Sequence, residues 1–300
     1  MGVAVMAEER PMIREEMVEY LKTHAKTWVP MEVSENPFAG MSFSDLQGRL
    51  GGFESANYGD IPEFDRVKEN LASNFDGRTE WGSCVHEIRD QGGCGSCWAF
   101  GASESLSDRF CINSNGAIDV VLSPQYQVSC DGGQLGCGGG YLSTTWDFLQ
   151  KTGTVKDSCM PYTSGKTGSE PRCPSSCSDG ASMNHYKCSN VEHARGVDKI
   201  KSFITEGPVE VQFHVYDDFY NYKSGVYTRK SFNYVGDHDV KVVGWGHDDA
   251  TGMNYWIAQN SWGPAWGEDG FFRIHEGECS FDDTAYACTP DLSSGAIFVE

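Results

Sequence analysis

Residues 90–100 have the sequence DQGGCGSCWAF, and this stretch decides how the rest of the chain is interpreted. A glycine-containing loop leads to Cys97, and residues 97–110 lack proline and carry large apolar residues at helical spacing. Cys97 is therefore predicted in the first turn of a helix, where free backbone amides and the positive end of the helix dipole favour a thiolate. The simpler interpretation makes Cys94 and Cys97 one more disulfide, redox or zinc pair.

The chain of 300 residues carries twelve cysteines, which restricts its compartment. Cytosolic proteins seldom hold so many thiols without a metal, so the alternatives are a zinc protein and a disulfide-bonded protein of the secretory route. Ligand-like gaps occur only at Cys94/Cys97 and Cys173/Cys177, without a second knuckle at regular spacing. We therefore expect disulfides, and no metal or cofactor.

Charge and hydropathy exclude two classes of partner. Acidic residues outnumber basic residues by 43 to 23, which gives a formal charge of −20. Nucleic acids and anionic membranes need a basic surface, so we expect neither as a partner. No apolar run approaches the ~18 residues of a membrane helix. The first residues hold an apolar stretch shorter than the core of a signal peptide, so a leader is not evident.

The order of predicted elements indicates an α+β fold. Residues 1–70 hold too few large apolar residues to fold alone, and we predict that they form a separate segment. Helices are predicted at 12–26, 97–110, 141–151 and 197–205. Strands are predicted at 209–215, 225–227, 238–245, 254–258 and 270–275. A chain that is helical first and β later predicts two lobes that meet at a cleft.

The residues around Cys97 resemble the active-site motif of the papain family of cysteine proteases. That family's signature places a cysteine after C-G-[SA] and before an aromatic residue, with a histidine and an asparagine further along the chain. Here His238 lies in GDHDVKVVGWG and Asn260 in YWIAQNSWG, in the family's order. Because three motifs agree, the disulfide or zinc interpretation of Cys97 is disfavoured.

The resemblance implies a papain-like two-lobe fold. Its helical lobe would cover about residues 84–185, and its β-barrel-like lobe about residues 186–290. Together they would form a catalytic domain of residues 71–300, preceded by an inhibitory, partly helical propeptide of residues 1–70.

The resemblance also implies a role for each motif residue. Cys97 would attack the peptide carbonyl as a thiolate, and His238 would pair with it and then protonate the leaving amine. Asn260 would orient the imidazole, and Trp262 would shield that hydrogen bond from water. Gln91 and the backbone N–H of Cys97 would form the oxyanion hole.

Other positions match the family's substrate cleft. Gly139 and Gly140 correspond to the glycines that pair with the substrate backbone, although Gly138 replaces the asparagine that usually precedes them. The remaining cleft positions expected from the resemblance are Gly95, Tyr141, Leu142, Gln212, Asp239 and Thr284.

Asp239 departs from the family, because the residue after the catalytic histidine is normally alanine or glycine. That residue lines S2, the pocket for P2, the second residue before the cut bond. If Asp239 faces S2, arginine or lysine is expected at P2. Alternatively, Asp239 pairs with Lys241 on the same strand face. A third interpretation is that its carboxylate perturbs the ion pair of Cys97 and His238 and lowers activity.

Within the family the resemblance is strongest to the cathepsin B group, over residues 74–111 and, for the propeptide, 16–53. It implies that the propeptide lies backward through the cleft with Gly51 and Gly52 near Cys97, where glycine permits close backbone approach. The group's occluding loop carries paired histidines. The corresponding stretch here, residues 159–173, is short and has none, which predicts an open cleft and endopeptidase activity.

The resemblance implies four disulfides, namely Cys84–Cys111, Cys94–Cys137, Cys130–Cys173 and Cys159–Cys177. Apart from Cys97, this leaves Cys188, Cys279 and Cys288, so at least one of them is a free thiol or forms an intermolecular link.

We therefore expect a cysteine endopeptidase, made as a zymogen, that cleaves protein and peptide substrates. It would act as a monomer in an acidic lysosome-like or endosomal vacuole, or after secretion. Acid pH suits the charge of −20, because protonation relieves self-repulsion. Its inhibitors would be its own propeptide and cystatin-like or epoxide compounds. The alternative is a catalytically impaired papain-fold binding protein.

Overall fold

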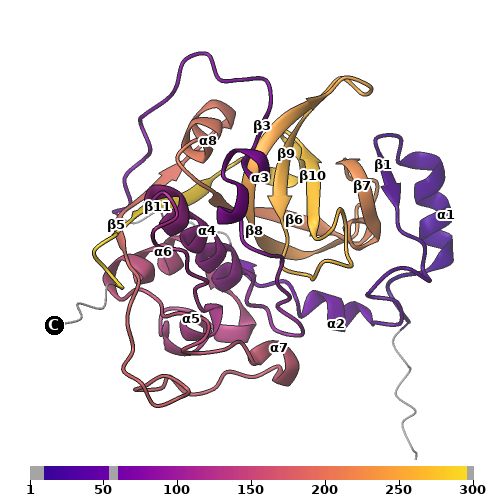
Figure 1. The fold of residues 1–300 in the computed structure, drawn as a ribbon. Helices are drawn as coiled ribbons and strands as arrows, with labels where there is room; N and C mark the ends of the chain where they lie inside the picture. The colour runs from indigo at the N-terminus through magenta and orange to yellow at the C-terminus, as the bar shows by residue number, and fades with distance from the viewer. Residues whose placement is uncertain (1–9, 54–59, 296–300) are drawn as a thin grey trace, which may run out of the picture.

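The structure, a computed structural model, describes residues 10–53 and 60–295. The predicted propeptide lies only partly in this range, because residues 1–9 and 54–59 are outside the described residues. Two lobes lie side by side, which confirms the α+β prediction, with helices at the lower left and strands at the upper right of Figure 1. The helical lobe contains α4 (Cys97–Asn113), α5 (Pro124–Cys130), α6 (Leu142–Lys151) and α7 (Ser164–Thr167).

The β lobe is built on one curved sheet with the strand order β1-β7-β10-β9-β8-β6-β11-β5, and β3 also pairs with β8. This order starts at β1 and ends at β5, so the sheet is barrel-like but open. The strands are β1 (Trp28–Pro30), β3 (Phe75–Asp76), β5 (Cys188–Ala194), β6 (Val209–Tyr216), β7 (Tyr222–Tyr227), β8 (Tyr234–Asp248), β9 (Met253–Gln259), β10 (Phe271–His275) and β11 (Ala285–Pro290). A further helix, α8 (Val197–Ile204), packs against β5 and β8.

In strand β6 the side chains on both faces are buried, although the alternation of apolar and polar residues in its sequence predicts only one buried face. Val209, Val211 and Phe213 are buried, as the period of two predicts. Glu210, on the opposite face, is fully buried as well. Both faces of β6 are covered because α4 and α6 contact the face that carries Glu210.

Helix α4 runs between the lobes and is buried from Cys97 to Cys111. The side of α4 that faces the sheet is polar. Asp108 Oδ2 lies 2.6 Å from Lys241 Nζ on β8, and both side chains are completely buried. The other oxygen, Oδ1, accepts a hydrogen bond from His86 Nδ1 at 2.6 Å. The alternative that pairs Lys241 with Asp239 is therefore wrong, because the lysine side chain bonds to α4 across the interface between the lobes.

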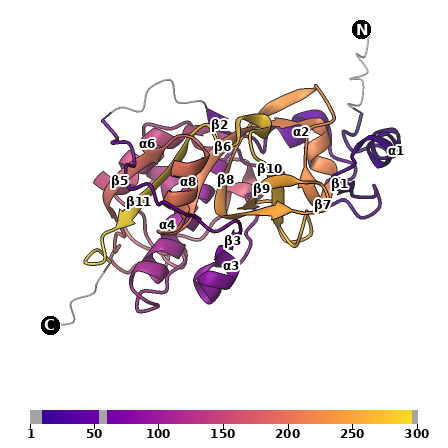
Figure 2. The same ribbon diagram turned by 90° about the horizontal axis from the view of Figure 1, so that it is seen from above.

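The N-terminal segment wraps around the β lobe, in indigo at the right of Figure 1 and again at the right of Figure 2. Helix α1 (Glu15–His24) buries Val18 and Leu21, while Tyr20 is exposed and stacks on His24. The chain continues through β1, which pairs with β7, and through α2 (Phe43–Gln47). It then forms β2 (Gly52–Phe53), which pairs in parallel with β4 (Gly140–Tyr141) of the helical lobe. After residues 54–59 the chain reaches β3 and α3 (Gly77–Glu80).

The cysteines form five disulfides. The structure contains the four pairs that the resemblance implied, Cys84–Cys111, Cys94–Cys137, Cys130–Cys173 and Cys159–Cys177. A fifth joins Cys188 on β5 to Cys288 on β11. Cys97 and Cys279 are the free thiols, so Cys279 is the odd cysteine that the count required. In the described part of the chain, no helix combines the length and apolar character needed to cross a membrane.

The buried ion pair leads to a stability prediction. Lys241→Met, made in a Cys97→Ala background to prevent autolysis, removes the lysine from the buried Asp108 carboxylate, which keeps only its bond to His86, and we expect a loss of about 3 kcal/mol in the free energy of unfolding. Lys151→Met is the matched control, because Lys151 forms an exposed helical pair with Asp147; we expect a loss below about 0.5 kcal/mol. Urea unfolding measures both, and equal losses in the two variants would contradict the prediction.

Candidate active site

Cys97 is the first residue of α4 and is completely buried. The preceding loop turns tightly, with a hydrogen bond from Gly95 N to Cys137 O (3.0 Å) and a disulfide from Cys94 to Cys137. These contacts hold the start of the helix against the β4 segment. Cys97 Sγ lies 3.8 Å from Asp239 Oδ2 on β8, so the thiol points out of the helical lobe toward the sheet.

His238 and Asn260 lie on neighbouring parts of the sheet, in β8 and directly after β9. His238 Nε2 donates a hydrogen bond to Asn260 Oδ1 at 2.8 Å, and both side chains are completely buried. The Trp262 ring stacks on His238 with centroids 4.8 Å apart. Phe38 of the N-terminal segment packs edge-on against that ring. Among the described residues, the other imidazole nitrogen, Nδ1, has no hydrogen-bond partner.

Gln91 is held from three sides. Its backbone N–H bonds to Ser261 O (2.9 Å), and its side-chain Oε1 accepts from Ser261 Oγ (2.7 Å). Its amide nitrogen Nε2 donates to Cys94 O (2.9 Å) and to Arg49 O (2.7 Å). One amide hydrogen is thus fixed within the site, and the other donates to a carbonyl of the N-terminal segment. An amide fixed in this way can donate to a carbonyl oxygen without first reorganising.

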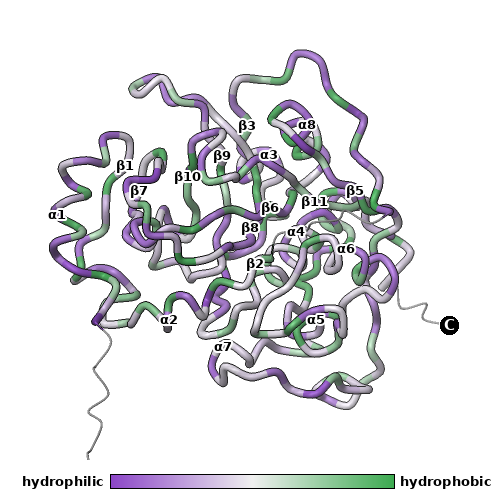
Figure 3. Tube along the Cα trace, turned by 180° about the vertical axis from the view of Figure 1, so that it is seen from behind, coloured by the Kyte–Doolittle hydropathy of each residue, from purple (hydrophilic) through white to green (hydrophobic). Residues whose placement is uncertain are grey.

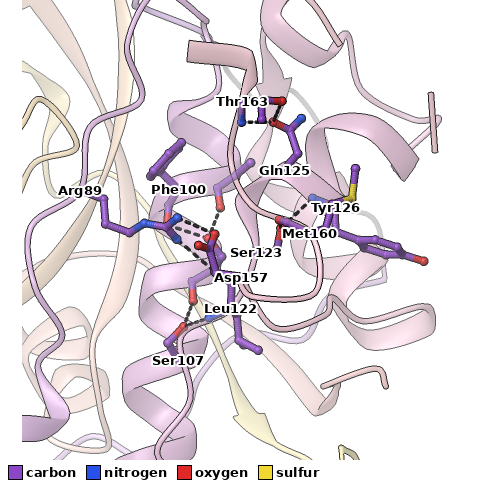
Figure 4. A network of polar contacts seen from close by, with 12 residues as sticks. Arg89, Phe100, Ser107, Leu122, Ser123, Gln125, Tyr126, Asp157, Met160 and Thr163 are labelled. Atoms are coloured by element: carbon purple, nitrogen blue, oxygen red, sulfur yellow. Dashed lines mark hydrogen bonds and ion pairs between the residues drawn. The ribbon is translucent and has the colours of Figure 1, made fainter. Parts of the chain in front are cut away.

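Figure 4 shows a polar network of the helical lobe that includes Arg89, Gln125 and Asp157. Arg89 donates to Asp157 (2.6 Å) and to Leu122 O (3.1 Å), and its guanidinium lies over the Phe100 ring of α4. On the other side, Gln125 Oε1 accepts from Thr163 N at 2.8 Å. The network ties the loop after Cys84 and the loop after Cys159 to the helical lobe.

Tyr162 is a site residue that the sequence analysis missed. Its hydroxyl donates to Gln91 O (2.8 Å) and lies 2.7 Å from Ser96 Oγ, so it joins the residues before Cys97 to Gln91. Gly165, in the same loop, accepts a hydrogen bond from Gly93 N (2.8 Å). The short 159–173 loop that was expected to leave the cleft open therefore packs under the Gln91 loop. A tyrosine in a loop gives no periodic signal, and only the cysteines that bound this loop marked it.

Two glycines bring the N-terminal segment against Cys97. A Cβ on Gly51 would overlap the carbonyl group of Gly95, so only glycine fits there. Gly140 N donates to Gly51 O (2.8 Å). A Cβ on Gly139, whose φ is +120°, would lie 2.7 Å from that same oxygen. The glycines expected to bind a substrate backbone thus bind this segment, next to the exposed Tyr141 and the buried Leu142 at the start of α6.

The Asp239 side chain faces the N-terminal segment at Gly52 and does not face Lys241. A Cβ on Gly52 would lie 2.6 Å from Asp239 Oδ1 and 2.9 Å from Gln212 Nε2, so these two side chains border the space that Gly52 leaves empty. The Gln212 amide interacts with the Asp239 carboxyl and partly offsets the effect of burial on its pKa. Asp239 and Gln212 are opposite each other in the register of β6 and β8. Thr284 precedes Ala285, which pairs with Val211, so continuing that register places Thr284 beside Gln212.

Burial is the main cause of the pKa shifts in the site. Desolvation raises the pKa of the Cys97 thiol well above its usual range, and the Asp239 carboxyl raises it further. Desolvation lowers the pKa of His238 to about 4, despite its hydrogen bond to Asn260. It also raises the pKa of Asp239 and of the neighbouring Glu210 well above the usual range. With the N-terminal segment in place, the thiol and the imidazole are both held in their neutral forms.

Comparison with known proteins identifies the family. The family model described as "Papain family cysteine protease" matches residues 71–289. The chain belongs to the papain family of cysteine proteases. It is 46% identical over 226 residues to cathepsin B-like CP2 of Giardia intestinalis, covering 73% of this chain and 75% of that protein. It is 37% identical over 266 residues to cathepsin B-like cysteine proteinase 5 of Caenorhabditis elegans, covering 76% of this chain and 77% of that protein.

Solved structures of proenzymes share the fold. Procathepsin B S9 from Trypanosoma congolense superposes with a TM-score of 0.85 at 28% identity, over 94% of this chain and 100% of that one. The procathepsin L2 of the larval midgut of Tenebrio molitor has a TM-score of 0.76 at 24% identity, over 92% of this chain and 88% of that chain, which supports the fold alone. The identification as a cathepsin B-like cysteine protease is thereby confirmed.

Tyr162 offers a test of how this protease holds its active-site loop. Tyr162→Phe removes two hydrogen bonds, and we expect kcat to fall about 5–30-fold while KM changes less than about twofold, because the Phe ring still fills the space. Tyr126→Phe is the control, since the Tyr126 hydroxyl bonds to His185 on the outside of the same lobe. Steady-state kinetics on a fluorogenic peptide measures both; a change confined to KM would contradict a role in positioning.

Proposed function

We propose that the chain is the zymogen of a cysteine endopeptidase whose residues 1–70 keep it latent. The observation that carries the proposal is the convergence of two lobes on one buried site, with the Cys97 thiol at the start of α4 and the hydrogen-bonded pair of His238 and Asn260 on the sheet. The bond from His238 to Asn260 uses Nε2 and leaves Nδ1 without a partner among the described residues, as a general base requires.

The mechanism follows from these atoms. When water and substrate replace the N-terminal segment, desolvation decreases, and His238 takes the proton of Cys97. The thiolate attacks the peptide carbonyl, and Gln91 Nε2 and the backbone N–H of Cys97 stabilise the oxyanion. His238 protonates the leaving amine, and water then hydrolyses the thioester. Asn260 fixes the imidazole plane, and Trp262 covers their bond.

Latency follows from how the N-terminal segment uses the same donors. The Arg49 carbonyl occupies the Gln91 amide, and Gly51 lies against Gly95 next to the nucleophile. Further support is that the family model begins at residue 71 and that the whole chain of a procathepsin B superposes on this one. Residues 1–70 are therefore proposed as the inhibitory propeptide and 71–300 as the catalytic domain.

Two features define the substrate. The 159–173 loop is pinned by Cys159–Cys177 and Cys130–Cys173 and packs on Gly92 and Gly93, which supports an open cleft and endopeptidase activity. Asp239 and Gln212 meet at the Gly52 position, where the segment offers no side chain. The buried Asp239 carboxyl forms no ion pair with a residue of the described chain, which favours a cationic side chain in S2, so we propose arginine or lysine at P2. Five disulfides support a secretory route ending in an acidic vacuole or outside the cell.

Activity and cleavage mode are tested together. After acid activation we expect hydrolysis of an internally quenched peptide to exceed release of dipeptides from a carboxy-terminal substrate by at least about tenfold. An epoxide thiol inhibitor should form an adduct at Cys97 and abolish activity, while the intact chain is labelled slowly because its thiol pKa is raised. Cys279, the other free thiol, is the internal control. An activated chain without a Cys97 adduct would favour the impaired binding protein instead.

The specificity proposal predicts a pH dependence. Burial under the N-terminal segment raises the pKa of Asp239. Water that enters the cleft when the segment leaves reduces this shift, and the carboxyl becomes charged as pH increases through the pKa that it has in the open cleft. We therefore expect the ratio of kcat/KM for P2 arginine over P2 leucine to rise with pH and to fall on acidification. Asp239→Asn should lower the ratio about tenfold or more and flatten the profile, because the charge-assisted bond is lost. Asp179→Asn, at an exposed site in a loop, should leave the kcat/KM ratio and its pH profile unchanged. If Asp239→Asn and Asp179→Asn gave the same pH profile, Asp239 would be excluded from S2.

A further inference from the structure

His86 lies in the loop that follows Cys84 and is held against the C-terminal half of α4. The disulfide from Cys84 to Cys111 ties the start of this loop to the helix. His86 N donates to Asp108 Oδ1 at 3.2 Å, so the backbone and the ring of His86 bind the same carboxylate. Figure 3 shows α4 in the middle of the molecule, beside β6, β8 and β11. The imidazole therefore contacts the helix that begins with Cys97.

Both ring nitrogens of His86 meet a carboxylate. Nδ1 lies 2.6 Å from Asp108 Oδ1, and Nε2 lies 2.9 Å from Asp119 Oδ1. A carboxylate oxygen accepts hydrogen bonds, and a neutral imidazole carries only one N–H. The ring is 15% exposed, so water can replace little of either contact. Only the doubly protonated, positively charged ring satisfies both carboxylates.

Asp119 is exposed, but the chain around it is fixed. Leu122 N donates to Ser107 Oγ of α4 at 3.0 Å, and Arg89 donates to Leu122 O at 3.1 Å, as Figure 4 shows. The Asp119 carboxylate therefore stays within reach of the His86 ring, and the charge of the ring decides whether it is bound.

The charged ring completes an electrically balanced group of side chains. Asp108 Oδ2 binds Lys241 Nζ of β8 at 2.6 Å, so two cations face the carboxylates of Asp108 and Asp119. We call His86, Asp108, Asp119 and Lys241 the acid lock. The titratable and charged side chains that face the ring or its partners are Glu104 and Asp108 of α4, Asp119, Lys241 of β8, and Arg89 of the same loop.

Two titrations in this interface change its charge in the same direction. Desolvation lowers the pKa of His86, but the bonds to Asp108 and Asp119 outweigh it and raise the pKa above its usual value. Desolvation raises the pKa of Glu104 to about 7, despite two nearby cations. As pH increases past neutrality, His86 loses a positive charge and Glu104 gains a negative one. The interface between α4 and β8 then holds excess negative charge.

The sign of the effect on stability follows from these directions. The contribution of His86 is complete below its unfolded pKa of about 6.5 and is lost as pH rises through its higher folded value. The cost of burying Glu104 grows between its ordinary pKa of 4.5 and about 7. Both groups favour the closed interface at acid pH.

We propose that His86 is a positioning residue whose charged form holds α4 against β8 by binding Asp108 and Asp119. These two elements carry Cys97 and His238, so the acid lock sets the upper limit of pH at which the site keeps its geometry. The inference rests on the proposed function, because it links the lock to peptide hydrolysis. All members of the lock lie within residues 71–300, so it persists when the N-terminal segment leaves.

Two variants are expected to shift the neutral limb of the pH profile in opposite directions. Asp119→Asn removes a carboxylate from the His86 ring and should move the upper midpoint of kcat/KM to lower pH by about half a unit. Glu104→Gln removes the carboxyl that charges near neutrality and should move this midpoint to higher pH by about half a unit. A role in packing alone gives no such opposition.

The profile is measured on acid-activated enzyme with a fluorogenic peptide that carries leucine at P2, so that the charge of Asp239 does not enter. His247→Gln is the matched control, because the His247 ring bonds to Asn254 at the other end of β8, and its midpoint should stay unchanged.

A second measurement does not depend on activity. In the full Cys97→Ala chain, an NMR titration of the histidine rings should give His86 a pKa above about 6.5, and Asp119→Asn should lower that pKa by about half a unit. If His86 titrates at or below about 6.5, or both variants shift the midpoint in one direction, or neither differs from His247→Gln, the acid lock is refuted while the protease activity stands. If the peptide is not hydrolysed at any pH, the proposed function fails, and the titration still decides the state of His86.

Discussion

Helix α4 is buried between the two lobes, and this forces charged groups into the interior. Asp108 on α4 and Lys241 on β8 lose their hydration and compensate by binding each other, and Asp108 also bonds to His86. The same two elements carry Cys97 and His238. The ion pair therefore fixes the helix relative to the strand, and with them the two residues that we propose as nucleophile and base. The proposed catalytic geometry depends on a contact that takes no part in the chemistry.

The N-terminal segment accepts hydrogen bonds from donors of the candidate site but places no side chain beside Asp239 and Gln212. The Arg49 carbonyl and the Gly51 backbone use the bonds of Gln91 and Gly140. Gly52 is the residue that lies beside Asp239 and Gln212. If these two residues line the pocket that we propose, the segment leaves that pocket unfilled, and a substrate side chain can make contacts there that the segment does not make.

The sequence predicted the candidate site because the chemistry needs particular residues in local motifs. Cys97, His238 and Asn260 were predicted in this way, and the structure places His238 and Asn260 in hydrogen-bond contact. The helices and strands with a clear period were predicted as well. Three features could not be predicted from the sequence. Lys241 bonds to Asp108 of α4 rather than to Asp239. The sequence could not predict this contact, because the pattern of a strand does not tell which element covers each face of the strand. Glu210 is buried on the face that alternation marks as polar, because α4 and α6 cover it. Tyr162 acts through a loop contact that no periodicity records.

Strand β1 of the N-terminal segment completes one side of the sheet by pairing with β7, whose other neighbour is β10. If residues 1–70 are removed as we propose, the backbone groups of β7 that pair with β1 lose their partners and meet water. An unpaired strand edge is a template for another strand, from a second copy or an inhibitor. Lys223 on that edge, which pairs with Glu35 in this structure, would then carry an unpaired charge that discourages such pairing. The proposed activation would therefore expose a strand edge as well as the cleft.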